Sequence, residues 1–377
     1  MQRPVDVIVT GFTKSLVLLQ KSLTPLRLLK QEGVIRNIFC VTWDSTELDQ
    51  WVLPINGCSD IRLVRLPQPV VEGGATRRGV LYQIENLRAG LELAGDDAVI
   101  LKWRPDMVAN YTFLRDKILG FPQWSAIPSR NCMGVTMPRP VFNEKIWVPW
   151  ADSNSPFFHE DAVFMGARRE IEKLIAPLAL ADQERLEHPH NGAYAHIVRY
   201  ARPFLDTYPI FANYLRNIHL FRHDLDYRMK MVPLLVDNGF SWHLLIAHAW
   251  ILYSQFHVDA GNTMDLAFYS NYANRDVDWS NAPILNLSPP YDDVASWRED
   301  TVVGTALRSV SRAFGRLMDD GWQRELFMDR TPDFPRETLA AVMGNVAGYA
   351  DGRLAGLEAD FYQTLDRLYR GFHALPG

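Results

Sequence analysis

The first hundred residues alternate between short apolar runs and segments with helical spacing. Val5–Val9 is mostly apolar and ends at Thr10-Gly11, and Ser15–Leu23 then repeats apolar residues at helical intervals. The spacing breaks at Thr24-Pro25, a pair typical of a cap followed by a first-turn proline. This order predicts a strand, a loop and a helix that ends at the Thr24-Pro25 break.

Three more strands and a longer helix are predicted in the same part of the chain. The strands are Ile38–Thr42, Ile61–Leu66 and Ala98–Leu101, and the helix spans about Arg77–Ala94. The strand at 61–66 carries two arginines, so we expect it to be less buried than the others. Strands that alternate with helices favour an α/β fold with a mostly parallel, doubly wound sheet, in which ligands bind at the carboxyl ends of the strands.

The rest of the chain has weaker patterns. A helix is predicted at Arg168–Leu186. The segment Asn238–Val258 contains no Asp, Glu, Lys or Arg but holds three histidines, which favours a core helix over a membrane-spanning one. From about Asp292 onward, apolar residues recur at three- and four-residue spacing. We therefore expect an α/β domain over residues 1–290 and a C-terminal helical region over residues 291–377.

Composition and charge narrow the classes of function. The 377 residues are 47% hydrophobic and 22% charged, which suits a globular protein with a large core. The formal net charge of −5 gives no overall attraction to nucleic acid, so we expect no nucleic-acid partner. Three cysteines without a metal-ligand spacing, and an apolar start too short for a signal peptide, favour a cytoplasmic location.

The strongest chemical signal follows the strand at 98–101. The common dinucleotide, P-loop, hydrolase and zinc-protease motifs do not occur in the sequence. Lys102, Arg104 and Asp106 lie two residues apart, so on an extended chain they share one face. Lysine and arginine neutralise phosphoryl oxygens and aspartate binds Mg²⁺ or Mn²⁺, which predicts a diphosphate site with a divalent metal. An exposed salt bridge at the strand end is the alternative.

Four segments resemble one known family. They are VDVIVTGF, CVTWDST, RRGVLYQIENLRAGLELAGDDAVILKWRPD and EDAVFMG. Together they resemble the WavE lipopolysaccharide-synthesis family, whose members are similar to glycosyltransferases that use nucleotide sugars. The resemblance covers about residues 5–220. It implies a GT-A-like fold, with one Rossmann-like sheet and the nucleotide at its first strands, and it makes residues 1–290 the nucleotide-sugar-binding and catalytic domain.

The resemblance also implies roles for residues at the ends of the first strands. Thr10 and Gly11 are expected beside the nucleotide. Trp43 or Asp44, which follow the second strand, are expected beside its base or ribose. All four residues then belong to the nucleotide-sugar site.

The family typically has a Lys-x-Arg-x-Asp arrangement, which falls on Lys102, Arg104 and Asp106. Lys102 and Arg104 then bind the donor diphosphate, and Asp106 is a ligand of the divalent metal. Arg104 stands where the usual Asp-x-Asp pattern has its first aspartate. A cationic pair that stabilises the leaving diphosphate without a metal is therefore the alternative.

A catalytic base is expected at Glu160-Asp161. If transfer inverts the anomeric centre, a base must remove the proton of the acceptor hydroxyl, and carboxylates serve this purpose near neutral pH. The pair follows a segment rich in aromatic residues and prolines, whose rings can shape an acceptor pocket. The family pattern selects Asp161 over Glu160. An acidic pair that faces water is the alternative.

These observations predict a glycosyltransferase that moves a sugar from a nucleotide-sugar donor to a hydroxyl of a cell-surface polysaccharide or lipid-linked lipopolysaccharide acceptor. A non-catalytic relative that binds nucleotide sugars or glycans and a purely structural protein are the alternatives. Arg308, Arg312 and Arg316 form a basic stripe that predicts contact with the inner face of a membrane or with a second copy, and a solvated face is the alternative. His243 and His248 are expected to be core histidines.

Overall fold

The computed structural model describes about half of the chain. The described residues are 3–11, 16–44, 58–68, 75–128, 131–132, 135–136, 138–149, 151, 157, 159, 161–175, 200–208, 211, 240–258, 266–268 and 285–286. Glu160 and the expected C-terminal helical region, residues 291–377 with their three arginines, lie outside the described residues.

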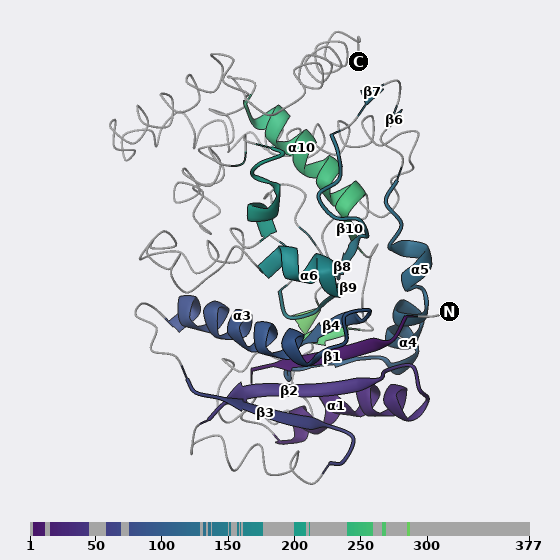
Figure 1. The fold of residues 1–377 in the computed structure, drawn as a ribbon, viewed down its shortest axis with the longest axis vertical. Helices are drawn as coiled ribbons and strands as arrows, with labels where there is room; N and C mark the ends of the chain where they lie inside the picture. The colour runs from purple at the N-terminus through teal and green to yellow at the C-terminus, as the bar shows by residue number, and fades with distance from the viewer. Residues whose placement is uncertain are drawn as a thin grey trace, which may run out of the picture.

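A seven-stranded sheet forms the centre of the described fold. Its strands are β1 (Val5–Thr10), β2 (Asn37–Trp43), β3 (Arg62–Leu66), β4 (Val99–Trp103), β8 (Ile146–Val148), β9 (Phe164–Ala167) and β10 (Phe256–Val258). The strand order is β10-β8-β9-β4-β1-β2-β3, and β9 alone is antiparallel to its neighbours (Figure 1). The expected α/β fold with a mostly parallel sheet is therefore confirmed.

The strand order reverses at β1. From β1 the chain passes through α1 (Leu16–Gln31) to β2 and on to β3, and it then returns through α3 (Ala75–Leu93) to β4 on the other side of β1. Helices α1 and α3 cover opposite faces of the sheet (Figure 1). The carboxyl ends of β1 and β4 therefore form a topological switch point, where open α/β sheets bind their ligands.

Helix α1 packs on the face to which the odd-numbered residues of β1 point. Val5, Val7 and Val9 are buried against the apolar stripe of α1. The predicted break at Thr24-Pro25 is wrong, because α1 continues through Pro25 to Gln31. Leu26 and Leu29 beyond the proline are fully buried. Burial of two leucines contributes about 3–6 kcal/mol, which outweighs the ~3 kcal/mol that an interior proline costs a helix.

Helix α3 packs on the other face, where it approaches the sheet closely. Gly90 lies directly on Ile8 of β1, and a Cβ at Gly90 would be 2.4 Å from Cγ2 of Ile8. Below this contact, the buried carboxylate of Asp6 receives hydrogen bonds from Arg36 (2.6 Å to Nη2) and from the backbone N of Gly95 (3.0 Å). The end of α3 is thus tied to the starts of β1 and β2.

The other strands and helices predicted in the first hundred residues are confirmed by β1, β2, β3, β4 and α3. The side chains of β3 are partly exposed, as expected. The helix predicted at 168–186 is described as α6 (Arg168–Ile175), and the core helix predicted at 238–258 is α10 (Phe240–Gln255), followed directly by β10. Among the described helices, none combines the length and apolar character needed to cross a bilayer.

Shorter elements complete the described structure. They are α4 (Tyr111–Leu119), α5 (Phe121–Trp124), a 3-10 helix at Arg202–Phe204, a second sheet of β5 (Met107–Ala109), β11 (Leu266–Phe268) and β12 (Leu285–Asn286), and the pair β6 (Asn131–Cys132) and β7 (Val135–Thr136).

The close approach at Gly90 gives a test of the packing between α3 and β1. Gly90→Ala should lower the free energy of unfolding by about 1–3 kcal/mol, because overpacking against Ile8 outweighs the ~1 kcal/mol gain in helix propensity. Denaturant unfolding measures the change. In an Ile8→Ala background the same substitution should be neutral or stabilising, and an equal loss in both backgrounds contradicts the proposed contact.

Candidate functional site

Three side chains from the carboxyl ends of adjacent strands face α3. Ile8 of β1 pairs with Lys102 of β4, so Lys102 and Thr10 project from the same face of the sheet. Trp43 ends β2 on this face, and its ring meets the ring of Tyr82 from α3 edge-on at 5.1 Å. The structure therefore brings together predicted residues from three strands at the switch point.

The ammonium of Lys102 is the polar centre of this region. The side chain is fully buried, and Nζ donates hydrogen bonds to Oε1 of Gln83 on α3 (2.8 Å) and to the carbonyl oxygen of Ala162 (3.1 Å). It also donates to the carbonyl of Asp161, and it lies 5.7 Å from the centre of the Phe164 ring. Lys102 thus joins β4 to α3 and to the segment that leads into β9.

Arg104 and Asp106 form an ion pair just beyond the strand. Strand β4 ends at Trp103, and the backbone then turns, with the N–H of Met107 donating to the carbonyl of Arg104 (3.0 Å). The expected two-residue alternation on an extended chain therefore stops before Arg104. Its guanidinium donates to both carboxylate oxygens of Asp106, at 3.0 and 2.6 Å. The side chain of Asp106 is 1% exposed and that of Arg104 is 19% exposed.

The surroundings of Asp106 oppose a role as a metal ligand. Burial raises the pKa of Asp106, and the positive charges of Arg104 and Lys102 offset part of this effect. Both carboxylate oxygens are engaged by Arg104. The described part of the chain also contains no group of three or more His, Cys, Asp or Glu side chains placed to hold a metal ion. The described residues therefore do not fit the divalent metal expected at Asp106, and no step is assigned to one.

Thr10 and Asn86 bring polar atoms without partners into the same region. Thr10 is fully buried, and its Oγ1 has no hydrogen-bond partner in the described structure. The next residue, Gly11, leaves the strand with a φ of 93°, in the left-handed region that favours glycine. Asn86 of α3 is also fully buried, and neither Oδ1 nor Nδ2 has a partner among the described residues.

Asn86 lies over the end of β1. Tyr82, Asn86 and Gly90 form one row along α3 at four-residue spacing. The first contacts Trp43 of β2 and the last contacts Ile8 of β1. The pair of Thr10 with Val41 lies between these two points on the sheet. Two buried polar side chains without partners among the described residues therefore lie in the same part of the interface between α3 and the sheet.

Sequence reasoning missed Asn86 because a single amide on an amphipathic helix usually faces water. The sequence did contain a signal that Asn86 is buried. Asn86 is four residues from Gly90 and next to Leu87, which belongs to the apolar face of the helix, so it lies on the side that packs on the sheet.

Asp44 and Asp161 lie at the edge of the region. The side chain of Asp44 is 70% exposed and lies 3.7 Å from Arg65, so it faces solvent beyond the buried Trp43. Asp161 is half-buried and precedes β9, whose Phe164 pairs with Lys102. Its carbonyl is held by Lys102, so Asp161 lies beside the carboxyl end of β4. Of the predicted acidic pair, the structure describes this member only.

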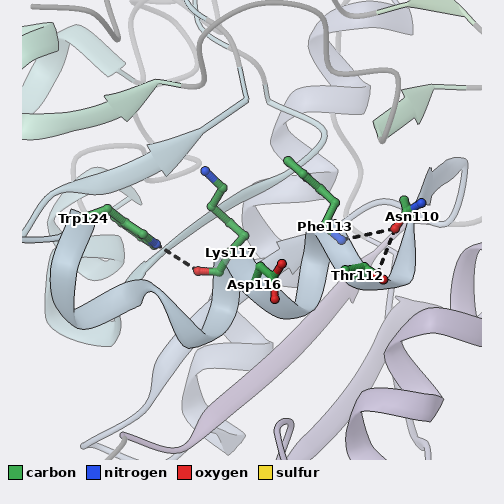
Figure 2. A pocket seen from close by; sticks show the side chains of 6 residues that line it. All are labelled: Asn110, Thr112, Phe113, Asp116, Lys117 and Trp124. Atoms are coloured by element: carbon green, nitrogen blue, oxygen red, sulfur yellow. Dashed lines mark hydrogen bonds between the residues drawn. The ribbon is translucent and has the colours of Figure 1, made fainter.

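A separate hollow of about 610 Å³ lies on α4 and α5. It is lined by Asn110, Thr112, Phe113, Asp116, Lys117 and Trp124 (Figure 2). The ammonium of Lys117 lies 5.6 Å from the centre of the Trp147 ring and 3.2 Å from Nε2 of His257. Burial, together with the charges of Lys117 and Lys145, lowers the pKa of His257 to about 3. None of the residues predicted for the nucleotide-sugar site lines this hollow.

Comparison of the chain with known family models and with curated proteins gives no match. The fold and the site define an α/β protein with a mostly parallel sheet and a polar region at its switch point. The resemblance to the WavE family stays a prediction.

The buried carboxyl of Asp106 should make stability depend on pH. Burial raises the pKa of Asp106 in the folded protein. The protonated Asp106 carboxyl therefore contributes stability below its ordinary pKa of 3.8, and this contribution is lost as the pH rises through the pKa of the folded protein. Asp106→Asn has no such loss. The unfolding free energy of the variant relative to wild type should therefore rise as the pH increases above the ordinary carboxyl pKa of 3.8, while its melting temperature stays within about 5 °C.

Chemical denaturation at several pH values measures this difference. Asp116→Asn is the control for the substitution itself, because the Asp116 side chain is 66% exposed. A pH-independent difference for Asp106→Asn contradicts the effect of burial on the Asp106 carboxyl.

Proposed function

We propose that this protein is a glycosyltransferase with a GT-A-like fold. It moves a sugar from a nucleotide-sugar donor to a hydroxyl of a cell-surface polysaccharide or lipopolysaccharide acceptor, on the cytoplasmic side of the cell membrane. The observation that carries the proposal is the pair of buried, unsatisfied side chains, Thr10 and Asn86, beside the charged residues of the switch point.

Unsatisfied polar groups are expensive, so they favour a ligand. Each buried donor or acceptor without a partner costs about 1–3 kcal/mol. A nucleoside offers hydroxyl groups and base edges that both donate and accept, which matches the hydroxyl of Thr10 and the amide of Asn86. The rings of Trp43 and Tyr82 lie beside them and supply an aromatic wall. A small anion alone would leave the Asn86 carbonyl oxygen unsatisfied.

The two cations contribute to diphosphate binding in different ways. Arg104 is partly exposed, and a guanidinium has five N–H donors, so it can hold Asp106 and a phosphoryl oxygen together. Lys102 is fully buried and bonded to protein oxygens, so it supplies positive potential rather than direct contact. This division stabilises the charge that develops on the leaving diphosphate without a metal ion.

Asp161 completes the transfer as the base. The acceptor oxygen forms a bond to the anomeric carbon while the bond from that carbon to the diphosphate oxygen breaks. The hydroxyl proton passes to the Asp161 carboxylate, which is half-buried at the end of β4. The electron pair of the broken bond leaves on the diphosphate, beside Arg104.

A non-catalytic nucleotide-sugar-binding protein is the second candidate. The observation that favours it is that both carboxylate oxygens of Asp106 accept hydrogen bonds from Arg104, so this carboxylate does not serve as a metal ligand. Binding of the donor without product on intact-mass analysis distinguishes this candidate from the transferase.

Two threonines on opposite faces of the sheet test donor binding. Thr42 is buried and its Oγ1 also has no partner among the described residues, but it projects toward α1. Thr10→Val and Thr42→Val should each raise the free energy of unfolding without ligand by about 1 kcal/mol, because an unsatisfied hydroxyl is removed. Thr10→Val alone should weaken nucleotide binding, by ~10-fold, since only Thr10 faces the proposed site.

The measurement is a thermal shift with UDP-, GDP-, CMP- and dTDP-sugars, followed by calorimetry with the one that stabilises. Equal nucleotide affinity in both threonine variants, or no shift with any donor, overturns the assigned site.

Asp161→Asn tests the chemical step. The amide keeps the shape of the side chain but cannot accept the proton, so turnover should fall by at least ~100-fold with donor affinity unchanged. Product formation is followed by mass spectrometry. A variant that retains wild-type turnover excludes Asp161 as the base.

A further inference from the structure

A histidine of α10 holds the backbone ahead of Asp161. The backbone N of Phe157 donates a hydrogen bond to Nε2 of His248 at 3.1 Å, and both residues are fully buried. Because Nε2 accepts, the imidazole is neutral and carries its proton on Nδ1. His248 is therefore a core histidine, as expected, but its ring also has a specific polar contact.

The backbone at Phe157 is in an unusual conformation. Its φ is 64°, in the left-handed region that phenylalanine rarely adopts. Such a conformation persists only where the surroundings fix it. The Phe157 ring packs edge-on against Phe211 at 4.6 Å and stacks with Phe204 at 5.6 Å, while the ring of His248 lies at 5.3 Å.

Further contacts hold His159, Asp161 and Ala162. The ring of His159 stacks on Phe256 at 4.7 Å, and His159 forms a β-bridge with Ala151. The carbonyls of Asp161 and Ala162 then accept hydrogen bonds from Lys102. Of the described residues around Asp161, Phe157 is thus held by α10, and Asp161 and Ala162 are held by β4.

We propose that His248 is a positioning residue for Asp161. The inference rests on the proposed function, in which Asp161 is the base. The hydrogen bond to His248 holds Phe157, four residues before Asp161, and Lys102 holds the carbonyl of Asp161 itself. Together these two contacts fix the backbone that carries the half-buried Asp161 carboxylate beside the end of β4, where the proposed function places the acceptor hydroxyl.

Two amide variants separate the hydrogen bond from the packing. In His248→Gln the amide oxygen extends about as far as Nε2 and can still accept from Phe157, whereas in His248→Asn it is one methylene shorter and cannot. Trp250→Phe is the control, because Trp250 is buried on the same helix and its ring lies against Tyr253.

The first measurement is hydrogen exchange resolved at the Phe157 amide of the full chain. Exchange should be at least ~10-fold faster in His248→Asn than in wild type, and close to wild type in His248→Gln and in Trp250→Phe. Equal protection in His248→Asn and wild type overturns the proposal. So does a loss of protection in Trp250→Phe as large as in His248→Asn, since the effect is then general loosening of α10.

The second measurement is turnover with the donor that stabilises the protein. His248→Asn should lower kcat by ~10-fold or more with the donor KM unchanged, and His248→Gln should restore kcat. Unchanged kcat in a variant that has lost Phe157 protection shows that the segment does not position the base, and overturns the proposal. If wild type forms no product while exchange behaves as expected, the proposed transferase function fails and the assigned hydrogen bond stands.

Discussion

The buried ammonium of Lys102 is the constraint on which the switch point depends. A lysine in the middle of a sheet is tolerated only when its charge is surrounded by oxygen atoms. Burial of an ion without such partners costs on the order of several kcal/mol. The required oxygens come from Gln83 on α3 and from the carbonyls of Asp161 and Ala162. These two segments can therefore move little relative to β4. Lys102 thus fixes α3 and the backbone at Asp161 relative to the carboxyl end of its own strand.

A second buried charge fixes the other end of the same helix. Asp6 binds Arg36, Asn37 and the backbone N of Gly95, just beyond the end of α3. Between the two charges, Gly90 lies in close contact with Ile8. Helix α3 is thus held at Gln83 and at Gly90, and the chain is held again at Gly95, just beyond the end of the helix. Within this arrangement the amide of Asn86 and the hydroxyl of Thr10 have no partners among the described residues, at a cost in stability.

Local patterns were sufficient to predict the first half of the sheet. The strands from Val5 to Trp103 are apolar runs separated by turn residues, and α3 has a clear apolar face, so periodicity identified both. The strands β8, β9 and β10 are three or four residues long, too short for any periodic signal, and they form only through pairing with distant strands. The continuation of α1 through Pro25 likewise depends on leucines that become buried against the sheet. The spacing of Lys102, Arg104 and Asp106 predicted a site at the end of β4, but the turn that pairs Arg104 with Asp106 has no sequence signal at this range.

The different surroundings of Lys102 and Arg104 explain why the site is built from two kinds of cation. An ammonium is a compact charge that three oxygens can satisfy, so Lys102 can be buried and structural while its field still reaches the strand end. A guanidinium is a planar fork with more donors than one carboxylate can use, so Arg104 can be oriented by Asp106 and remain partly exposed. Exchange of the two residue types would reverse these properties. A buried guanidinium at position 102 would need more acceptors than Gln83 and two carbonyls provide. A lysine at position 104 would lose the two hydrogen bonds to Asp106 that orient the side chain of Arg104. The buried position at the end of β4 therefore suits a lysine and the partly exposed position just beyond the strand suits an arginine, which is the cation that the proposed function places against a phosphoryl oxygen.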